Sequence, residues 1–455
     1  MDDDGRATDW VDGRNAALLT DLYELTMAAS YFENGMNGPA TFDLSIRELP
    51  EQRNFLVVCG LEQALGYLED LRFEDDSLSY LRSLGLFTDE FLSFLGGLSF
   101  TGKIWAVPEG ETVFASEPLI RVTAPIIEAQ IVESFLMNCI TFQTMVASKA
   151  ARVAVACGDR QFVDYSLRRD HGADAGLKAA RASFIAGASA TSNVLAGKLY
   201  GIPVSGTMAH SYVMAFESEI SAFRAYARAF GDRTILLIDT FDVEDGGRNA
   251  AIVAKETEAR GTRIKGVRID SGDLASLTRS VRKILDEAGL DYMQIVLSGD
   301  LDEFHIRRLL DAGVPADAFG IGTQLGTSGD APSLGGAYKL VEDERGPRIK
   351  LSTGKATTPG RKQIYRFSRG GESYDLITLE DEDVPGGRPL LEKVMEDGNA
   401  VRPSEPLAEL RERCKRAISS LPRELLSLEG KQDPYPVRLS DRLQGLVDAM
   451  HGSSR

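Results

Sequence analysis

The stretch Ile-Lys-Gly-Val-Arg-Ile-Asp-Ser-Gly-Asp-Leu, residues 264 to 274, carries the pattern that decides the fold. Its apolar part predicts a buried β-strand, Ile264–Ile269, and the Asp-Ser-Gly run after it predicts a turn into a helix. Similar apolar runs recur at intervals of about 30 residues, the length of one strand-plus-helix unit. The other runs, each ended by Gly, Ser, Thr or Asp, are Ile202–Val204, Thr234–Ile238, Gln294–Leu297 and Ala318–Ile321.

Strands that alternate with helices favour a parallel sheet. This rhythm is typical of an α/β barrel, and a doubly wound open sheet is the alternative; both place the active site beyond the carboxyl ends of the strands. Outside this region the pattern differs. Phe42, Leu44 and Ile46 alternate as in a strand, residues 126–146 predict a long buried helix, and the chain after residue 345 becomes β-like and basic.

The composition limits the classes of function. The 455-residue chain is 43% hydrophobic and 26% charged, with a formal net charge of −17. This balance argues against general nucleic-acid binding but allows an anionic substrate at a local basic cluster. The four cysteines are far apart and contain no CxxC pair, so we expect reduced, buried thiols. An acidic amino terminus and the lack of a long apolar run predict a cytoplasmic protein that does not contact membranes.

Several candidate functional residues follow the predicted strands. Arg168 can grip a carboxylate or phosphate through two parallel hydrogen bonds, although a surface arginine is the simpler interpretation. Tyr165 offers a flat face to an aromatic ring. Arg268 and Asp270 are two residues apart and face the same side of a strand. There they can form a salt bridge only, or bind an anion together with a ribose or Mg²⁺.

Two glycine-containing turns and one histidine complete the candidates. Ser298-Gly299-Asp300 and Gly320-Ile321-Gly322-Thr323 suit a phosphate, because glycine lets backbone N–H groups approach oxygen atoms closely. Tight strand-to-helix turns use the same residues. His210 is one of four histidines in the chain and follows a predicted strand. Considered alone, it is more often a structural histidine than a catalytic one, and no two histidines have the spacing of a metal site.

Six stretches, in the same order along the chain, resemble the nicotinate phosphoribosyltransferase family. They are LLTDLYELTMA (18–28), LRRDHGADAGLKAARASFIAGASATSNVLAGKLYGIPVSGTMAHS (167–211), GVRIDSGDL (266–274), SGDLDE (298–303), FGIGTQLGTS (319–328) and STGKATTPGRKQIYR (352–366). The resemblance implies an irregular α/β barrel of the type II phosphoribosyltransferase kind, beside an α+β domain formed from N- and C-terminal segments. We expect a disordered segment at 1–15, the α+β domain at 16–125 and 345–440, the barrel at 126–344, and a tail at 441–455.

The resemblance also implies an activity. The enzyme would join nicotinate to phosphoribosyl diphosphate, giving nicotinate mononucleotide and diphosphate in NAD salvage. Mg²⁺ would accompany the diphosphate, and ATP would be a co-substrate whose hydrolysis is coupled through transient phosphorylation of His210. The active unit is implied to be a homodimer with shared active sites, in which Tyr23 reaches the neighbouring pocket.

Roles for individual residues follow from the same resemblance. Tyr165 and Tyr23 would sandwich the pyridine ring, and the glycine turns would cradle the 5′-phosphate. The catalytic residues would be His210, Arg168 and Asp270. The substrate-binding residues would be Tyr23, Tyr165, Ser192, Thr207, Arg268, Ser271, Gly299, Gly322 and Thr323.

Ser192 bears on the choice between an acid and an amide substrate. The similar nicotinamide phosphoribosyltransferase family has an aspartate here, which accepts from an amide NH₂ and repels a carboxylate, whereas a serine hydroxyl can donate to a carboxylate. Serine therefore favours nicotinate. The chain departs from the family pattern at Tyr165-Ser166, at Asp170-His171 and at Gly299. The alternatives are a phosphoribosyltransferase for nicotinamide or another pyridine base, and a non-catalytic nucleotide-binding homologue.

Overall fold

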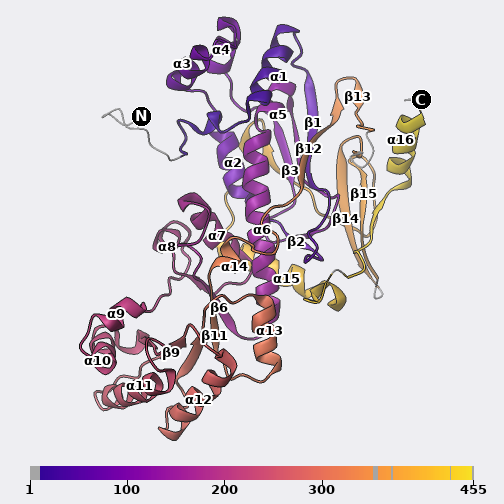
Figure 1. Cartoon of the computed structure of the whole chain (residues 1–455). Coiled ribbons are helices and arrows are strands. Elements are labelled where there is room, and N and C mark those ends of the chain that lie inside the picture. Colours follow the sequence, from indigo (N-terminus) through magenta and orange to yellow (C-terminus); the bar gives the residue numbers. More distant parts are fainter. Residues whose placement is uncertain (1–10, 352–356, 370–371, 431, 453–455) are drawn as a thin grey trace. The chain divides into compact units, whose positions relative to one another are not determined.

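The chain forms two compact units, and one of them draws on both ends of the sequence. The structure is a computed structural model that describes residues 11–351, 357–369, 372–430 and 432–452 (Figure 1). The first unit comprises Met1–Thr144, Ser333–Leu425 and Gly430–Arg455, and the second comprises Met145–Pro332 with Leu426–Glu429.

The second unit is built on a six-stranded parallel sheet in the order β7-β6-β11-β10-β9-β8. The last of these strands in the chain, β11, pairs with the first, β6, so the strands follow one another around a circle. A doubly wound sheet would instead leave its last strand at an edge. The strands are β6 (Gln161–Asp164), β7 (Ala190–Thr191), β8 (Ile235–Leu237), β9 (Gly266–Ile269), β10 (Gln294–Leu297) and β11 (Ala318–Ile321).

The circle of strands is incomplete. Val204 extends it by a single bridge to Thr191 on β7, and in the described part of the chain no pairing joins Val204 to β8. The run Ile202–Val204, which the sequence predicts to be a strand, forms only this one bridge. Pro203 has no N–H to donate to a neighbouring strand, and Val204 is 52% exposed. The sheet is a partly open barrel, which confirms the predicted class.

Helices return the chain between these parallel strands. Among them, α10, α11 and α12 pack side by side (Figure 1). Parallel strands with helical connections bring all the carboxyl ends of the strands to one edge of the sheet. The helices of this unit are α7 (Ala173–Ile185), α8 (Val194–Tyr200), α9 (His210–Met214), α10 (Glu219–Phe230), α11 (Val243–Glu258), α12 (Leu274–Glu287), α13 (Glu303–Asp311) and α14 (Thr323–Gly326), with the second half of α6 (Glu133–Cys157).

The first unit contains a seven-stranded sheet in the order β13-β12-β1-β5-β3-β17-β18. N-terminal strand β3 pairs with β17 from the C-terminal segment, so both ends of the chain share one sheet, as the predicted α+β unit requires. The alternating Phe42, Leu44 and Ile46 are all buried on β1. The strands are β1 (Pro39–Ile46), β3 (Lys103–Ala106), β5 (Pro118–Pro125), β12 (Gly336–Asp343), β13 (Gly346–Pro347), β17 (Glu392–Glu396) and β18 (Asn399–Ala400).

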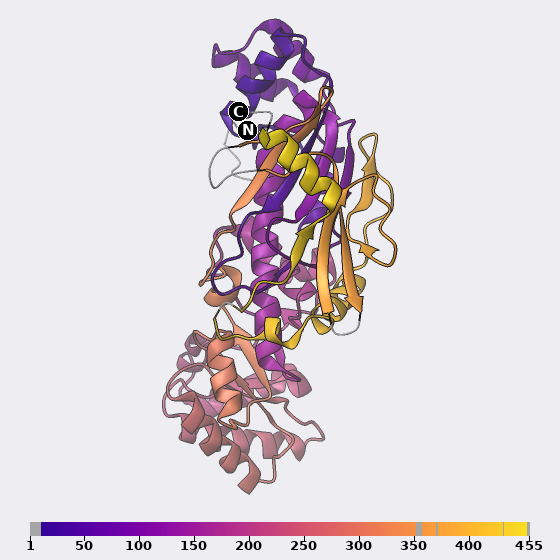
Figure 2. The same cartoon turned by 90° about the vertical axis from the view of Figure 1, so that its right-hand side faces the viewer.

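A smaller four-stranded sheet and several helices complete the first unit. Helix α16 (Asp441–Gly452) packs on β15 of this sheet and buries Leu443, so the described residues of the expected tail are folded (Figure 2). The remaining strands are β16 (Arg388–Pro389), β14 (Lys362–Arg369), β15 (Glu372–Leu379), β19 (Val437–Leu439), and the pair β2 (Leu56–Val57) and β4 (Thr112–Val113). The remaining helices are α1 (Leu22–Glu33), α2 (Leu61–Glu69), α3 (Asp75–Ser83), α4 (Asp89–Gly96), α5 (Ile126–Ile131) and α15 (Leu407–Ser419).

The unit boundaries lie elsewhere than the sequence suggests. The helix expected over 126–146 is interrupted at Val132, and α6 continues to Cys157, so the first boundary falls inside α6 at Thr144. The first unit resumes at Ser333 because β12 pairs with β1. Within the segment 1–15, which was expected to be disordered, residues 13–15 form a turn and residues 1–10 lie outside the described part. Residues 352–356 also lie outside it.

None of the four cysteines forms a disulfide, and all four are buried, as their spacing in the sequence predicts. Among the described residues, no helix combines the length and the apolarity that crossing a membrane requires.

Arg366 joins the smaller sheet to β4 through buried ion pairs. Its guanidinium donates to Asp375 at 2.6 Å and to Glu111 at 3.1 Å, and all three side chains are nearly inaccessible. Because Arg366→Met leaves the fully buried carboxylate of Asp375 without its cation, we expect the free energy of unfolding to fall by about 3–5 kcal/mol in denaturant titrations. Arg388→Met is the control, since Arg388 also pairs with Glu111 but is 56% exposed; its loss should stay below about 1 kcal/mol. Equal losses would contradict this account.

Candidate functional site

A cavity of about 500 Å³ lies where the strand ends of the second unit meet. All the predicted site residues except Tyr23 and Ser271 line it. The lining residues lie on or after the strands of the open barrel: Tyr165, Arg168, Arg169, Ser192, Gly206, Thr207, Met208, Ala209, His210, Arg268, Asp270, Ser298, Gly299, Asp300, Gly320, Gly322 and Thr323.

Arg268, on β9, binds to three neighbouring segments at once. Its Nε donates to the Thr207 hydroxyl at 3.0 Å, and its Nη2 donates to the Met208 carbonyl at 2.9 Å. Its Nη1 donates to Asp270 Oδ1 at 2.9 Å and to the Ser298 hydroxyl at 3.0 Å. A guanidinium has five N–H donors, so these bonds leave one for a substrate. Arg268 thus acts first as a support for the cavity wall.

Asp270 and His210 face each other across the cavity. The Ser298 hydroxyl and Arg268 both donate to Asp270 Oδ1, while Asp270 Oδ2 lies 4.0 Å from His210 Nε2. The other ring nitrogen, Nδ1, lies 3.2 Å from the Thr240 hydroxyl. If Nδ1 carries the proton of this bond, Nε2 presents a lone pair to the cavity. His210 is the first residue of α9, whereas the sequence placed it after a strand.

Two glycines permit close approaches at the cavity wall. A Cβ atom at Gly299 would lie 1.9 Å from the carbonyl oxygen of Asp270, and Gly299 has a φ of +96°. A Cβ at Gly320 would lie 2.4 Å from the Tyr165 ring. A side chain at either position would therefore displace Asp270 or Tyr165, which explains why these turns contain glycine.

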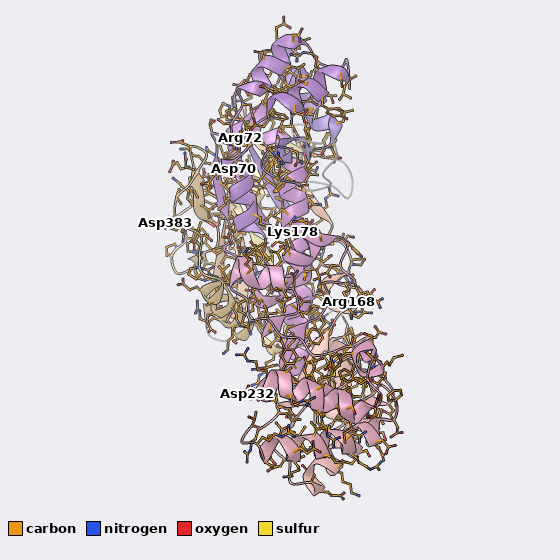
Figure 3. The ribbon with its side chains drawn as sticks, turned by 90° about the vertical axis from the view of Figure 1, so that its left-hand side faces the viewer. Asp70, Arg72, Arg168, Lys178, Asp232 and Asp383 are labelled. Atoms are coloured by element: carbon orange, nitrogen blue, oxygen red, sulfur yellow. The ribbon has the colours of Figure 1, made fainter. Side chains whose placement is uncertain are left out.

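The cavity carries positive charge within an acidic protein. Arg168 and Arg169 are exposed in the segment after β6, and Figure 3 shows Arg168 at the surface of the second unit. Among the described residues no salt bridge is formed by either one. Two guanidinium groups without a salt-bridge partner beside this pocket are suited to a carboxylate or a phosphate.

Ser271 and Tyr23 are placed differently from the other predicted residues. Ser271 does not line the cavity, because its hydroxyl donates to Asp239 Oδ2 at 2.6 Å, and the Asp270 N–H donates to the same oxygen at 3.1 Å. Ser271 therefore helps to fix the turn. Tyr23 belongs to the first unit, on α1, and is 47% exposed.

The two departures from the family pattern beside Arg168 contact each other. The Ser166 hydroxyl donates to Asp170 Oδ2 at 3.0 Å. The other oxygen, Oδ1, is buried without a hydrogen-bond partner, and a Cβ at Gly326 would lie 1.8 Å from it. Burial and the neighbouring carboxylate of Asp164 raise the pKa of Asp170 to about 6. Ser166 and Asp170 thus form one buried polar contact under the arginine segment.

Within the described ranges, no three His, Cys, Asp or Glu side chains gather in a way that could hold a metal ion. Asp239 and Thr240 support Asp270 and His210 but were not predicted, and Ser298, which supports Asp270, was predicted only as part of a phosphate turn. All three lie within two residues of the end of a predicted strand, so this position was the available signal.

Comparisons with known proteins agree with this arrangement. Three family models match the chain: the nicotinate phosphoribosyltransferase N-terminal domain at residues 18–141, the nicotinate phosphoribosyltransferase family at 160–340, and its C-terminal domain at 386–447.

Individual relatives cover nearly the whole chain. A nicotinate phosphoribosyltransferase of Mycobacterium tuberculosis is 46% identical over 431 residues, covering 94% of this chain and 92% of the relative. One from Bacillus subtilis is 42% identical and covers 81% of this chain and 77% of its own length. The crystal structure of human nicotinic acid phosphoribosyltransferase has a TM-score of 0.86 at 30% identity and covers 94% of this chain and 99% of its own.

The raised pKa of Asp170 predicts a pH-dependent stability. Because the folded state holds this proton more tightly than the ordinary value of 3.8 allows, Asp170 costs increasing stability as the pH rises from 3.8 to about 6. Asp170→Asn removes this cost. We expect its melting temperature to match that of the native protein near about pH 4 and to exceed it near about pH 8. A difference that does not change with pH would contradict the assignment.

Proposed function

Since the chain belongs to the nicotinate phosphoribosyltransferase family, we propose that its cavity joins nicotinate to phosphoribosyl diphosphate, giving nicotinate mononucleotide and diphosphate for NAD salvage. The observation that carries the proposal is a pocket that combines free arginines, a tyrosine ring and glycine turns at the ends of one parallel sheet. An anionic aromatic acid and a phosphorylated sugar need these groups.

The pyridine base would bind beside Tyr165. Its ring is fixed against Gly320, and its phenol is buried, which raises the pKa of Tyr165 and keeps it neutral. The carboxylate of the base would accept from Arg168, and Ser192 also lines the cavity and can donate to it. Nicotinamide would lose the charge-assisted bonds to the arginine.

The phosphoribosyl group would occupy the opposite wall. Gly299 and the Gly322–Thr323 turn expose backbone N–H groups for the 5′-phosphate, and Asp270 would accept from the ribose hydroxyls. The pyridine nitrogen attacks the anomeric carbon while the bond to diphosphate breaks, so the reaction requires no strong general base. Positioning and charge neutralisation then supply most of the catalysis.

Mg²⁺ would enter this site as a companion of the diphosphate. It is usually held by one or two carboxylates together with substrate phosphates, and Asp270 and Asp300 line the cavity. Asp270 Oδ2, which Arg268 and Ser298 leave available, and Asp300 would hold it. When bound, Mg²⁺ neutralises charge on the departing diphosphate.

His210 would couple ATP cleavage to the transfer. Its Nε2 would attack the γ-phosphorus of ATP, forming an N–P bond as the bond to the β-phosphate oxygen breaks and ADP leaves. Water would later hydrolyse the phosphohistidine to phosphate. The support for this role is the contact between Nδ1 and Thr240, which orients the ring with Nε2 towards Asp270. The added negative charge could then reorganise the cavity loops.

A homodimer with shared sites would bring Tyr23 to the base. Tyr23 lies on α1 with about half of its surface exposed, so its ring is free to stack on a ligand held by a second copy. Tyr165 would then contact one face of the pyridine ring and the partner's Tyr23 the other.

Ser192→Asp tests the base specificity. A carboxylate at this position repels the carboxylate of nicotinate and accepts from an amide, so kcat/KM for nicotinate should fall by about 100-fold while that for nicotinamide rises. Both bases are assayed with phosphoribosyl diphosphate, and Ser276→Asp on the exposed surface of α12 is the control. A native enzyme that prefers nicotinamide would refute the proposed substrate.

His210→Ala tests the coupling to ATP. We expect ADP formation during turnover to fall by at least about 100-fold, with the ATP-dependent stimulation lost and some ATP-independent transfer remaining. Nicotinate mononucleotide and ADP are quantified in the same reaction, with His451→Ala on the exposed end of α16 as the control. Unchanged ADP formation in His210→Ala would rule out the phosphohistidine.

A further inference from the structure

Lys149, on α6, is a buried cation that forms ion pairs with two residues, each of which follows one of the cavity loops. Its side chain is 1% exposed, and its Nζ lies 2.5 Å from Glu303 Oε2 and 2.8 Å from Asp330 Oδ1. Glu303 begins α13, directly after the loop that contains Gly299. Asp330 follows α14, whose first residue is Thr323. One ammonium group therefore connects the ends of both proposed phosphate loops.

The Glu303 end of this connection is firmly held. Glu303 is fully buried, and its second oxygen accepts from Arg152 Nε at 2.9 Å. Asp302 caps α13 by accepting from the His305 N–H at 2.7 Å, and Leu301 is 2% exposed. The loop is thus fixed immediately after Asp300. At its other end, the Ser298 hydroxyl is bound to Asp270 and Arg268.

The Asp330 end follows a tight turn. Ser328 is fully buried and has a φ of +45°, a left-handed conformation that is unusual outside glycine. The Ala331 N–H donates to the Ser328 carbonyl at 2.7 Å, which closes the turn around Asp330. The segment after Gly322 and Thr323 therefore also ends at a fixed point.

Lys149, Arg152, Glu303 and Asp330 do not line the cavity. Buried ion pairs stabilise a fold poorly, because the loss of hydration offsets much of their attraction. What such a pair fixes well is the distance between the segments that carry it. We propose that Lys149 is a positioning residue that sets the spacing between the Gly299 loop and the Gly322–Thr323 loop, and through it the affinity for phosphoribosyl diphosphate.

The inference rests on the proposed function and is tested by steady-state kinetics on the full chain. Lys149→Met keeps an unbranched side chain, one atom shorter, but removes both connections. We expect the KM for phosphoribosyl diphosphate to rise about tenfold, while the KM for nicotinate changes less than about twofold. Lys283→Met is the matched control, since Lys283 forms an exposed pair with Glu287 on α12 and is 77% exposed.

A second variant guards against misfolding. Lys149→Met leaves the buried Oε2 of Glu303 without a cation, whereas Asp330→Ala removes the connection to the Gly322–Thr323 side and keeps the buried pair of Lys149 with Glu303. It should raise the same KM in the same direction, and it decides the question alone if Lys149→Met does not fold.

Each result separates the two proposals. A purely structural role would lower the melting temperature and the amount of active enzyme but leave the KM for phosphoribosyl diphosphate unchanged in the folded variants. That outcome in an active native enzyme overturns the role of Lys149 alone. A native protein that forms no nicotinate mononucleotide overturns the proposed function, and the role of Lys149 with it.

Discussion

The candidate site depends on the guanidinium group of Arg268. Its planar donors fix Asp270 and Ser298 on one side and the Thr207–Met208 backbone on the other. Loops after three different segments of the sheet are thereby tied to one side chain. Because the geometry of a guanidinium is rigid, these loops have little freedom to move independently. The same bonds orient Asp270, so that one oxygen is occupied and the other faces His210.

The arginines of the cavity differ in whether they have an acidic partner, and this difference determines the electrostatics of the cavity. Arg268 is neutralised by its own partner, whereas Arg168 and Arg169 remain available to ligands. A net charge of −17 elsewhere on the chain does not oppose this, since charges farther away than about 8–10 Å are largely screened at physiological salt. Under the arginine segment, Ser166 and Asp170 form a buried polar contact.

The sequence predicts the parts of this structure that local pattern controls. Strands β10 and β11 have the bounds expected from their apolar runs, because a glycine or serine ends each run abruptly. The run before His210 does not form a strand, because Pro203 removes a donor from the ladder. Pattern also cannot reveal that Arg268 is occupied, since Thr207, Met208 and Ser298 come close to it only through the closure of the sheet.

Hydrogen bonds between residues of distant segments likewise cannot be predicted from the sequence. Ser298 belongs to a turn that the sequence predicts to bind phosphate, yet its hydroxyl contacts Asp270, which follows a different strand. Ser271 was expected at the substrate, but its hydroxyl meets Asp239, which follows a third strand. Hydrogen-bond partners across strands are set by register, and register appears only once the sheet is assembled.

The single bridge between Thr191 and Val204 has a consequence for how this fold can vary over evolution. The segment from residue 205 to His210 follows a single bridged residue, Val204. The segments after β9 and β10 instead follow strands that are paired with a neighbour on both sides. Insertions or deletions here would leave the register of every named strand unchanged. At the open side of the barrel, the segment before His210 can therefore change in length without any change in how the strands pair.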